Sequence, residues 1–136
     1  MISALQAIVL DFDGVIADSE PLHFMAFQQT LAEDGIELTS EDYYERYLGY
    51  DDVGMFQAVA RDRSIAVNDS RISSLVARKG SKLQTLLHGG DVLFPGAVDF
   101  IRAAASAVPL AIASGALRHE ILEIVEGAGL AHLFAT

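Results

Sequence analysis

The chain has 136 residues, of which 51% are hydrophobic, and its formal net charge at pH 7 is −10. This length and apolar content suffice for one globular domain with a buried core. The excess of acids argues against nucleic acids and anionic membranes as partners, because both are negatively charged. The lack of cysteine excludes disulfides and thiol chemistry. There is no basic leader with a cleavage site and no apolar stretch of membrane-spanning length, so we expect a cytoplasmic protein.

The first predicted element is a strand over residues 5–11, because Ile8-Val9-Leu10 is a continuous apolar run typical of a strand buried on both faces. Asp11 and Asp13 follow the run, and Gly14 lets the backbone turn so that both carboxylates reach the carboxyl end of the strand. Open α/β sheets bind ligands at this end. Two adjacent carboxylates repel each other unless a cation or a shared proton offsets their charge, which predicts a metal site or proton transfer. The alternative is a capped, solvated turn.

Four helices are predicted next, within residues 17–90. Their expected N-caps are Ser19, Thr39 or Ser40, Asp51 or Asp52, and one of Asn68, Asp69 and Ser70. Their expected ends are Gly35 at a C′ position, Gly49, Arg63 and the pair Gly89-Gly90. Residues 17–90 are therefore predicted to be an all-helical insertion.

An α/β pattern resumes after the insertion. A helix is expected over residues 97–107, a second strand over 109–114, a helix from 117 to 127 or 129, and a third strand that begins near Phe134. Strand–helix–strand order requires right-handed crossovers and a parallel sheet. Residues 1–16 and 91–136 are therefore assigned to a partial α/β core.

The segment Asp-Phe-Asp-Gly-Val-Ile-Ala-Asp-Ser-Glu-Pro-Leu-His, residues 11–23, resembles the first motif of the haloacid dehalogenase-like hydrolase superfamily. Ser114-Gly115, at the end of the second apolar run, resembles the second motif. The likeness is greatest to the branch with a small helical cap, which holds β-phosphoglucomutase and many sugar-phosphate phosphatases. It implies a Rossmann-like parallel-sheet core, incomplete in this chain, with the helical insertion as a cap.

The resemblance also implies a set of catalytic roles. Asp11 would attack phosphorus to form an aspartyl-phosphate, and Asp13 would act as general acid and then general base. Mg²⁺ would bind the Asp11 carboxylate and the Asp13 backbone carbonyl. Ser114 would hydrogen-bond a phosphoryl oxygen, with the backbone N–H groups of Phe12, Asp13 and Gly115 as further donors. The alternative for Ser114 is an N-cap of the helix that follows it.

Two residues of the cap are candidates for substrate contact by the same resemblance. His23 falls where relatives carry a histidine near the cap hinge, and Lys79 belongs to a basic pair, Arg78-Lys79. The alternatives are a structural histidine and a solvated basic helix face. Relatives with mutase activity follow the cap glycine with an arginine, whereas Gly49 is followed by Tyr50 here, which disfavours a mutase.

The leading hypothesis is a Mg²⁺-dependent phosphatase of a small phosphorylated metabolite, and the first alternative is a β-phosphoglucomutase-like phosphotransferase. The family's third and fourth motifs, which supply a lysine and further acids, do not occur in the sequence. We therefore expect an N-terminal piece of a longer protein, weakly active or inactive by itself. The second alternative is a non-catalytic fragment that binds or self-associates through an exposed sheet edge.

Overall fold

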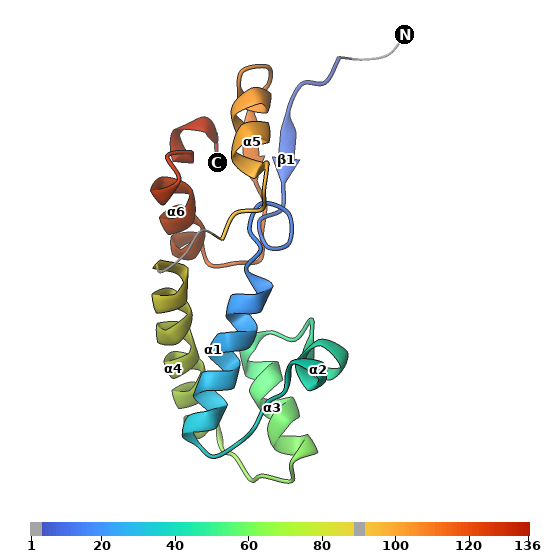
Figure 1. Ribbon diagram of the computed structural model, residues 1–136, viewed down its shortest axis with the longest axis vertical. Coiled ribbons are helices and arrows are strands. Elements are labelled where there is room, and N and C mark those ends of the chain that lie inside the picture. Colours follow the sequence, from blue (N-terminus) through green and yellow to red (C-terminus); the bar gives the residue numbers. More distant parts are fainter. Residues whose placement is uncertain (1–3, 89–91) are drawn as a thin grey trace. The chain divides into compact units, whose positions relative to one another are not determined.

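The computed structural model describes residues 4–88 and 92–136, which form two compact units (Figure 1). Unit 1 consists of Met1–Glu20 and Gly90–Thr136, and unit 2 of Pro21–Gly89. The predicted helix end at Gly89-Gly90 and the start of the second core segment at residue 91 lie outside the described residues. Across residues 4–88 and 92–136, none of the helices combines the length and the apolar character that crossing a bilayer requires.

Unit 1 contains a parallel sheet, as predicted. Strand β1 (Ile8–Leu10) pairs with β2 (Leu110–Ile112), and Ile8 lies opposite Leu110 in the register. The predicted start of a third strand is also present as a parallel bridge between Leu110 and Phe134. The Ala135 N–H donates to the Leu110 carbonyl at 2.7 Å, so the end of the chain adds to the free side of β2.

The expectation that the first strand spans residues 5–11 and is buried on both faces is wrong. β1 has only three residues, and its central residue, Val9, is 65% exposed. Ile8 and Leu10 point to the face that they share with the buried Leu110, while Val9 points to the opposite face because side chains alternate along a strand. Among the described residues of unit 1, no element covers that second face sufficiently to bury Val9. An apolar run therefore shows that a strand is present, but not which faces are covered.

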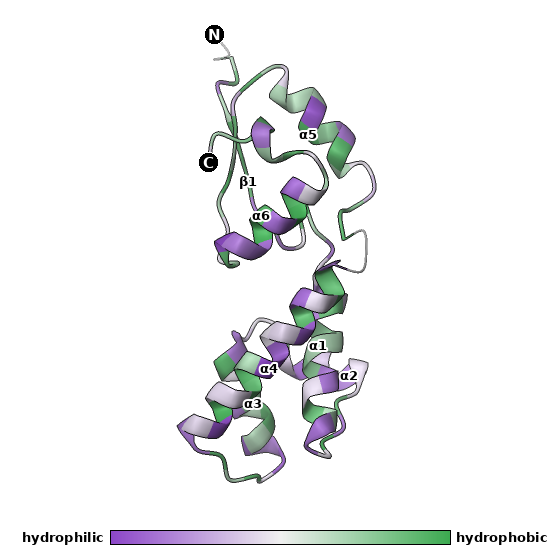
Figure 2. Ribbon diagram, turned by 90° about the vertical axis from the view of Figure 1, so that its left-hand side faces the viewer, coloured by the Kyte–Doolittle hydropathy of each residue, from purple (hydrophilic) through white to green (hydrophobic). Residues whose placement is uncertain are grey.

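The described residues of unit 1 also form two helices and a 3₁₀ turn: α5 (Ala97–Ala105), α6 (Arg118–Gly127) and η2 (Ala131–Leu133). Each helix displays both hydrophobic and hydrophilic segments in Figure 2, as expected for helices that have one side in a core. Their buried residues are Ile101 and Val125, which contribute to the core of unit 1 together with Leu110 and Leu130. The bounds of α5 and α6 agree with the sequence prediction to within two residues.

Unit 2 holds the predicted helical insertion: α1 (Glu20–Glu33), α2 (Ser40–Asp42), α3 (Asp52–Asp62) and α4 (Asp69–His88). Three predicted N-caps are confirmed by hydrogen bonds to the side chains of Thr39, Asp51 and Asn68. Gly35 adopts φ = +76°, and the Ile36 N–H donates to the Leu31 carbonyl, which is the expected glycine stop of α1. The second predicted helix is only partly α-helical, because Tyr43–Tyr47 forms a π-helix, η1.

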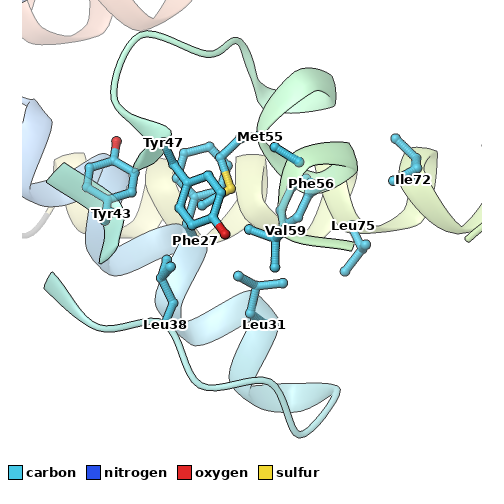
Figure 3. Close-up of a cluster of buried hydrophobic side chains, with 11 residues drawn as sticks. Phe27, Leu31, Leu38, Tyr43, Tyr47, Met55, Phe56, Val59, Ile72 and Leu75 are labelled. Atoms are coloured by element: carbon cyan, nitrogen blue, oxygen red, sulfur yellow. The ribbon is translucent and has the colours of Figure 1, made fainter. Parts of the chain in front are cut away.

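The core of unit 2 joins side chains from α1, η1, α3 and α4, with Leu38 from the segment between α1 and α2 (Figure 3). Phe27 of α1 and Phe56 of α3 meet edge to face with ring centroids 5.3 Å apart. Tyr43 and Tyr47 contribute from η1, and the Tyr47 hydroxyl reaches Asp62 at 2.9 Å. The π-helix thus places two tyrosines on the same side four residues apart, and both are buried.

Candidate active site

The two candidate acids belong to a tight loop directly after β1. The Phe12 carbonyl accepts three backbone N–H groups, from Val15, Ile16 and Ala17, at 2.9–3.2 Å. Phe12, Ile16 and Ala17 are buried, which anchors the loop in unit 1. Gly14 has φ = +77°, a conformation that L-residues rarely adopt, and its N–H donates to the Ala17 carbonyl at 2.8 Å. The predicted turn at Gly14 is therefore confirmed.

Each candidate carboxylate is held by one hydrogen bond within this loop. Asp11 is exposed, and its Oδ1 accepts the Phe12 N–H at 2.7 Å. The Phe12 N–H, expected as a phosphate donor, is thus engaged with Asp11 in this structure. Asp13 Oδ1 accepts the hydroxyl of Ser19 at 2.5 Å, and Ser19 is only 2% exposed. The buried Ser19 hydroxyl thus fixes the orientation of the Asp13 carboxylate.

The bond from Ser19 to Asp13 was missed by the sequence analysis. Ser19 was predicted only as a helix N-cap, and it does lie immediately before α1. Its separation from Asp13 by six residues corresponds to no regular helix or strand contact. Only the loop conformation brings the two side chains together, so the sequence carried no signal for this pair.

The carboxyl ends of β1 and β2 lie side by side, which brings Asp11 and Ser114 to the same edge of the sheet. Leu10 is opposite Ile112 in the register, and the Ala113 N–H donates to the Leu10 carbonyl at 2.9 Å. Asp11 follows β1 by one residue and Ser114 follows β2 by two. The predicted placement of acids and hydroxyl at the carboxyl ends of parallel strands is therefore present.

Ser114 does not cap the helix that follows it. Helix α6 begins at Arg118 with Leu117 in the N-cap position, whereas the Ser114 hydroxyl accepts the Ala116 N–H at 3.1 Å. Ser114 and Arg118 also line an open cavity of about 270 Å³ beside α6, which does not include Asp11 or Asp13 among its lining residues. Ser114 thus shapes the loop between β2 and α6 and keeps its hydroxyl hydrogen available as a donor.

Oxygen donors suited to Mg²⁺ are present near the end of β1. Mg²⁺ prefers hard oxygen ligands and usually retains several waters beside one or two carboxylates and substrate phosphates. The exposed Asp11 carboxylate and the Asp13 carbonyl fit such an ion. Within the described ranges, no group of three or more acidic or histidine side chains that could hold a metal occurs. The Asp11 carboxylate and the Asp13 carbonyl therefore match the oxygen donors and the small number of protein ligands that Mg²⁺ accepts.

The two candidate residues of unit 2 are in direct contact. Lys79 Nζ lies 2.9 Å from His23 Nδ1, 2.8 Å from Asp52 Oδ1 and 4.4 Å from the centre of the Phe27 ring. Lys79 is 1% exposed, so the alternative of a solvated basic face is wrong for this residue. The sequence analysis placed Asp52 at a helix start but did not connect it with Lys79, which is 27 positions away.

The neighbour of Lys79 has a different environment. Arg78 donates to Asp34 at 3.3–3.4 Å and lies 3.8 Å from Glu33. The hydrogen bond from Arg78 lowers the pKa of the Asp34 carboxyl, with a smaller contribution from Arg71 and partial opposition from desolvation. Arg78 thus connects α4 to the end of α1 through ion pairs at the surface of unit 2.

Comparison with known proteins gives consistent matches. Residues 5–136 match the family described as haloacid dehalogenase-like hydrolase. Protein CbbY of Rhodobacter capsulatus is 31% identical over 123 residues, which are 86% of this chain and 53% of CbbY. The chain therefore spans about half the length of this curated relative.

Three solved structures share the fold. A mutant of CbbY from Rhodobacter sphaeroides in complex with xylulose-(1,5)-bisphosphate has a TM-score of 0.78 at 23% identity, with 96% of this chain and 61% of that chain covered. A predicted phosphoglycolate phosphatase from Haemophilus somnus has a TM-score of 0.80 at 17% identity, with 96% of this chain and 60% of that chain covered. The putative hydrolase YfnB from Bacillus subtilis, bound to magnesium, has a TM-score of 0.72 at 18% identity, with 96% of this chain and 62% of that chain covered. The incomplete Rossmann-like core and the helical insertion are thus an arrangement that these proteins also contain.

Proposed function

Because this chain belongs to the haloacid dehalogenase-like hydrolase family and carries the N-terminal portion of its fold, we propose that the protein is a Mg²⁺-dependent phosphatase of small phosphorylated metabolites. The observation that carries this proposal is the position of Asp11 and Asp13. They follow β1 in a hydrogen-bonded loop that the buried Phe12 anchors, and the carboxyl end of β2, which leads to Ser114, lies beside that of β1. This edge of the sheet is where α/β folds bind ligands.

In the proposed reaction, Asp11 is the nucleophile. Its carboxylate attacks phosphorus, the ester P–O bond breaks, and an aspartyl-phosphate forms. Asp11 is suited to this step because it is exposed and because a carboxylate nucleophile requires no general base. Ser114 donates its hydroxyl hydrogen to a phosphoryl oxygen, and the Gly115 N–H is a second donor. The Asp11 carboxylate and the Asp13 carbonyl would hold Mg²⁺, which would offset the charge of the phosphoryl group.

Asp13 moves the proton in both half-reactions. It protonates the leaving oxygen of the metabolite and later takes a proton from the water that hydrolyses the aspartyl-phosphate, which releases inorganic phosphate. The hydrogen bond from the buried Ser19 holds the Asp13 carboxyl group in place for both steps.

The proposed substrate class follows from the relatives. One structure contains a sugar bisphosphate and another is described as a predicted phosphoglycolate phosphatase. Unit 2 is proposed to be the helical cap that selects the substrate, with His23 and Lys79 among its contributing residues. A β-phosphoglucomutase-like phosphotransferase would use the same Asp11 and Asp13 but return the phosphoryl group to the sugar.

The proposed activity is that of the whole protein. The chain spans 53% of its curated relative, and the family's lysine and further acids do not occur in it. The 136 residues alone are therefore expected to turn over weakly or not at all, and a non-catalytic role of this segment is the alternative.

The test is phosphate release by the full-length product of the gene with a panel of sugar phosphates and phosphoglycolate. We expect release that requires Mg²⁺, that Asp11→Asn abolishes, and that Asp13→Asn slows by about 10²- to 10⁴-fold. If the protein instead forms an isomer of the sugar phosphate without net phosphate release, the phosphatase proposal is wrong and the protein is a phosphotransferase. Turnover that persists in Asp11→Asn would refute both.

A further inference from the structure

The two edges of the sheet in unit 1 differ in how their backbone groups are paired. The segment after η2 closes the free side of β2, where the Ala135 N–H donates to the Leu110 carbonyl at 2.7 Å. On the other side of the sheet, no segment within residues 4–88 and 92–136 pairs with β1. β1 is therefore an edge strand, and the unpaired groups of an edge strand can pair with another chain.

The free edge of β1 is centred on Val9. The Ile8 N–H donates to the Pro109 carbonyl at 3.0 Å, and the Leu10 carbonyl accepts a hydrogen bond from β2 at 2.9 Å. Since the backbone groups of successive residues in a strand point to opposite sides, the N–H and C=O of Val9 point away from β2. The Val9 side chain is 65% exposed, so this residue offers a donor, an acceptor and an apolar surface.

β1 is also the part of the chain where two copies repel each other least. The net charge of −10 opposes self-association of the chain in general. Residues 1–10 contain no Asp, Glu, Lys or Arg, however, and neither do residues 103–117, which include β2. The free edge is therefore neutral and apolar. Because Val9 has both a donor and an acceptor, the edge is complementary to a second copy of itself about a twofold axis.

The position of Asp11 decides the direction of such a pair. A parallel pair of β1 strands would place Asp11 of both copies at the same end of adjacent strands, about 5 Å apart. An antiparallel pair centred on Val9 places Asp11 opposite Ala7 of the partner subunit, about 14 Å along the strand from the partner's Asp11. This separation exceeds the screening length of about 8 Å at physiological ionic strength. The antiparallel pair is therefore favoured.

We propose that this chain forms a dimer in which the β1 strands of two copies pair antiparallel about a twofold axis at Val9. Val9 exchanges two hydrogen bonds with Val9 of the partner subunit, and Ala7 pairs with the partner's Asp11. The two Val9 side chains lie on the same face of the joined sheet and shield each other from water. The dimer uses only backbone groups and apolar side chains of unit 1, so it does not rest on the proposed function.

A single introduced cysteine tests the register, because the chain has no cysteine of its own. Opposite residues in a hydrogen-bonded antiparallel pair have Cα atoms about 5.5 Å apart, which lies within the range of about 4.4–6.8 Å for disulfides. Ala7→Cys is the matched control, because the two copies of residue 7 lie about 14 Å apart in the proposed pair. Under mild oxidation, Val9→Cys should form a disulfide-linked dimer about tenfold faster than Ala7→Cys. Equal rates, or no linked dimer, would overturn the proposed register.

The wild-type chain of 136 residues tests the association itself. In sedimentation velocity experiments, we expect the average mass to rise with concentration from that of one chain toward that of two. A mass that stays that of one chain up to about 1 mM would overturn the dimer.

Val9→Pro tests the hydrogen bonds at the twofold axis. Proline is tolerated where the N–H of an edge strand faces outward, so this variant removes the outward donor and no bond to β2. We expect its association to be at least about tenfold weaker than that of the wild type. Val9→Thr keeps the N–H and the β-branched shape and should dimerise like the wild type. Equal association of Val9→Pro and Val9→Thr would overturn the proposal.

Amide hydrogen exchange tests the same bonds without a substitution. In the wild type, protection of the Val9 N–H should rise with protein concentration, whereas that of the Ile8 N–H, which already bonds to β2, should change little. Protection of Val9 that does not depend on concentration would show that the edge of β1 is not the interface.

Discussion

Removal of the Asp52 carboxylate alone, by Asp52→Asn, is predicted to destabilise unit 2 more than its removal together with the Lys79 amino group, by Asp52→Asn combined with Lys79→Met. Asp52→Asn leaves a buried ammonium group, 1% exposed, with a neutral partner at 2.8 Å. Breaking a fully buried ion pair costs about 3–5 kcal/mol. The Asp52 side chain is 37% exposed, so water screens part of this cost. We therefore expect Asp52→Asn to lower the free energy of unfolding by about 2 kcal/mol.

Lys79→Met has a different expected outcome, because it removes the charge that needs a partner and leaves an apolar side chain beside Phe27. Replacement of buried charges by apolar groups is often neutral or stabilising, so a change within about 1 kcal/mol is expected. In the Lys79→Met background, Asp52→Asn should cost only its interaction with the N-terminus of α3, about 0.3–1 kcal/mol. The double-mutant cycle should therefore give a coupling energy of about 1–2 kcal/mol.

The assay is urea unfolding followed by circular dichroism at 222 nm, which reports mainly the helices of unit 2. Asp51→Asn serves as a control for the helix terminus, since Asp51 caps α3 through the Gly54 N–H and does not contact Lys79. A coupling energy near zero would refute the reasoning. It would mean that Lys79 is neutral, or that Asp52 does not stabilise its charge.

Three further predictions concern the loop after β1, α4 and the ion pairs of α1. Gly14→Ala should lower the free energy of unfolding by about 1–2 kcal/mol in urea titrations, because alanine is strained at φ = +77° even though no atom lies within 4 Å of its Cβ. Gly80→Ala should instead raise it by about 0.5–1 kcal/mol, since α4 offers open space and a regular helical backbone there. Asp34→Asn should destabilise the protein at pH 7, with a loss that shrinks as the pH falls below 3.8. The reason is that Arg78 lowers the pKa of Asp34 in the folded state. The stabilisation by ionised Asp34 is therefore complete above the pKa of the unfolded state and is lost as the pH falls through the pKa of the folded state. Urea unfolding of both proteins at pH 7 and at pH 3 tests this.

Much of the candidate site could be predicted because its signals are local. Asp11, Asp13 and Gly14 are consecutive or nearly so, and a turn after an apolar run follows from glycine's backbone freedom. Ser114 follows a second apolar run, and the parallel order of the two strands brings it to the same edge of the sheet. The bond from Ser19 to Asp13 had no such signal, because it depends on how the intervening loop closes.

The sequence by itself determined the order of helices and strands, most helix caps and the position of the acids after the first strand, since propensity, capping and turn chemistry act between near neighbours. It overestimated the length and burial of that strand, because burial depends on what covers each face, as the exposed Val9 shows. Only the tertiary structure joined Lys79 to Asp52 and His23 and extended α2 into a π-helix at Tyr43. These features arise from side chains that are distant in sequence and meet only when the helices pack, where the cost of a buried charge or an unpaired polar group decides which partners it takes.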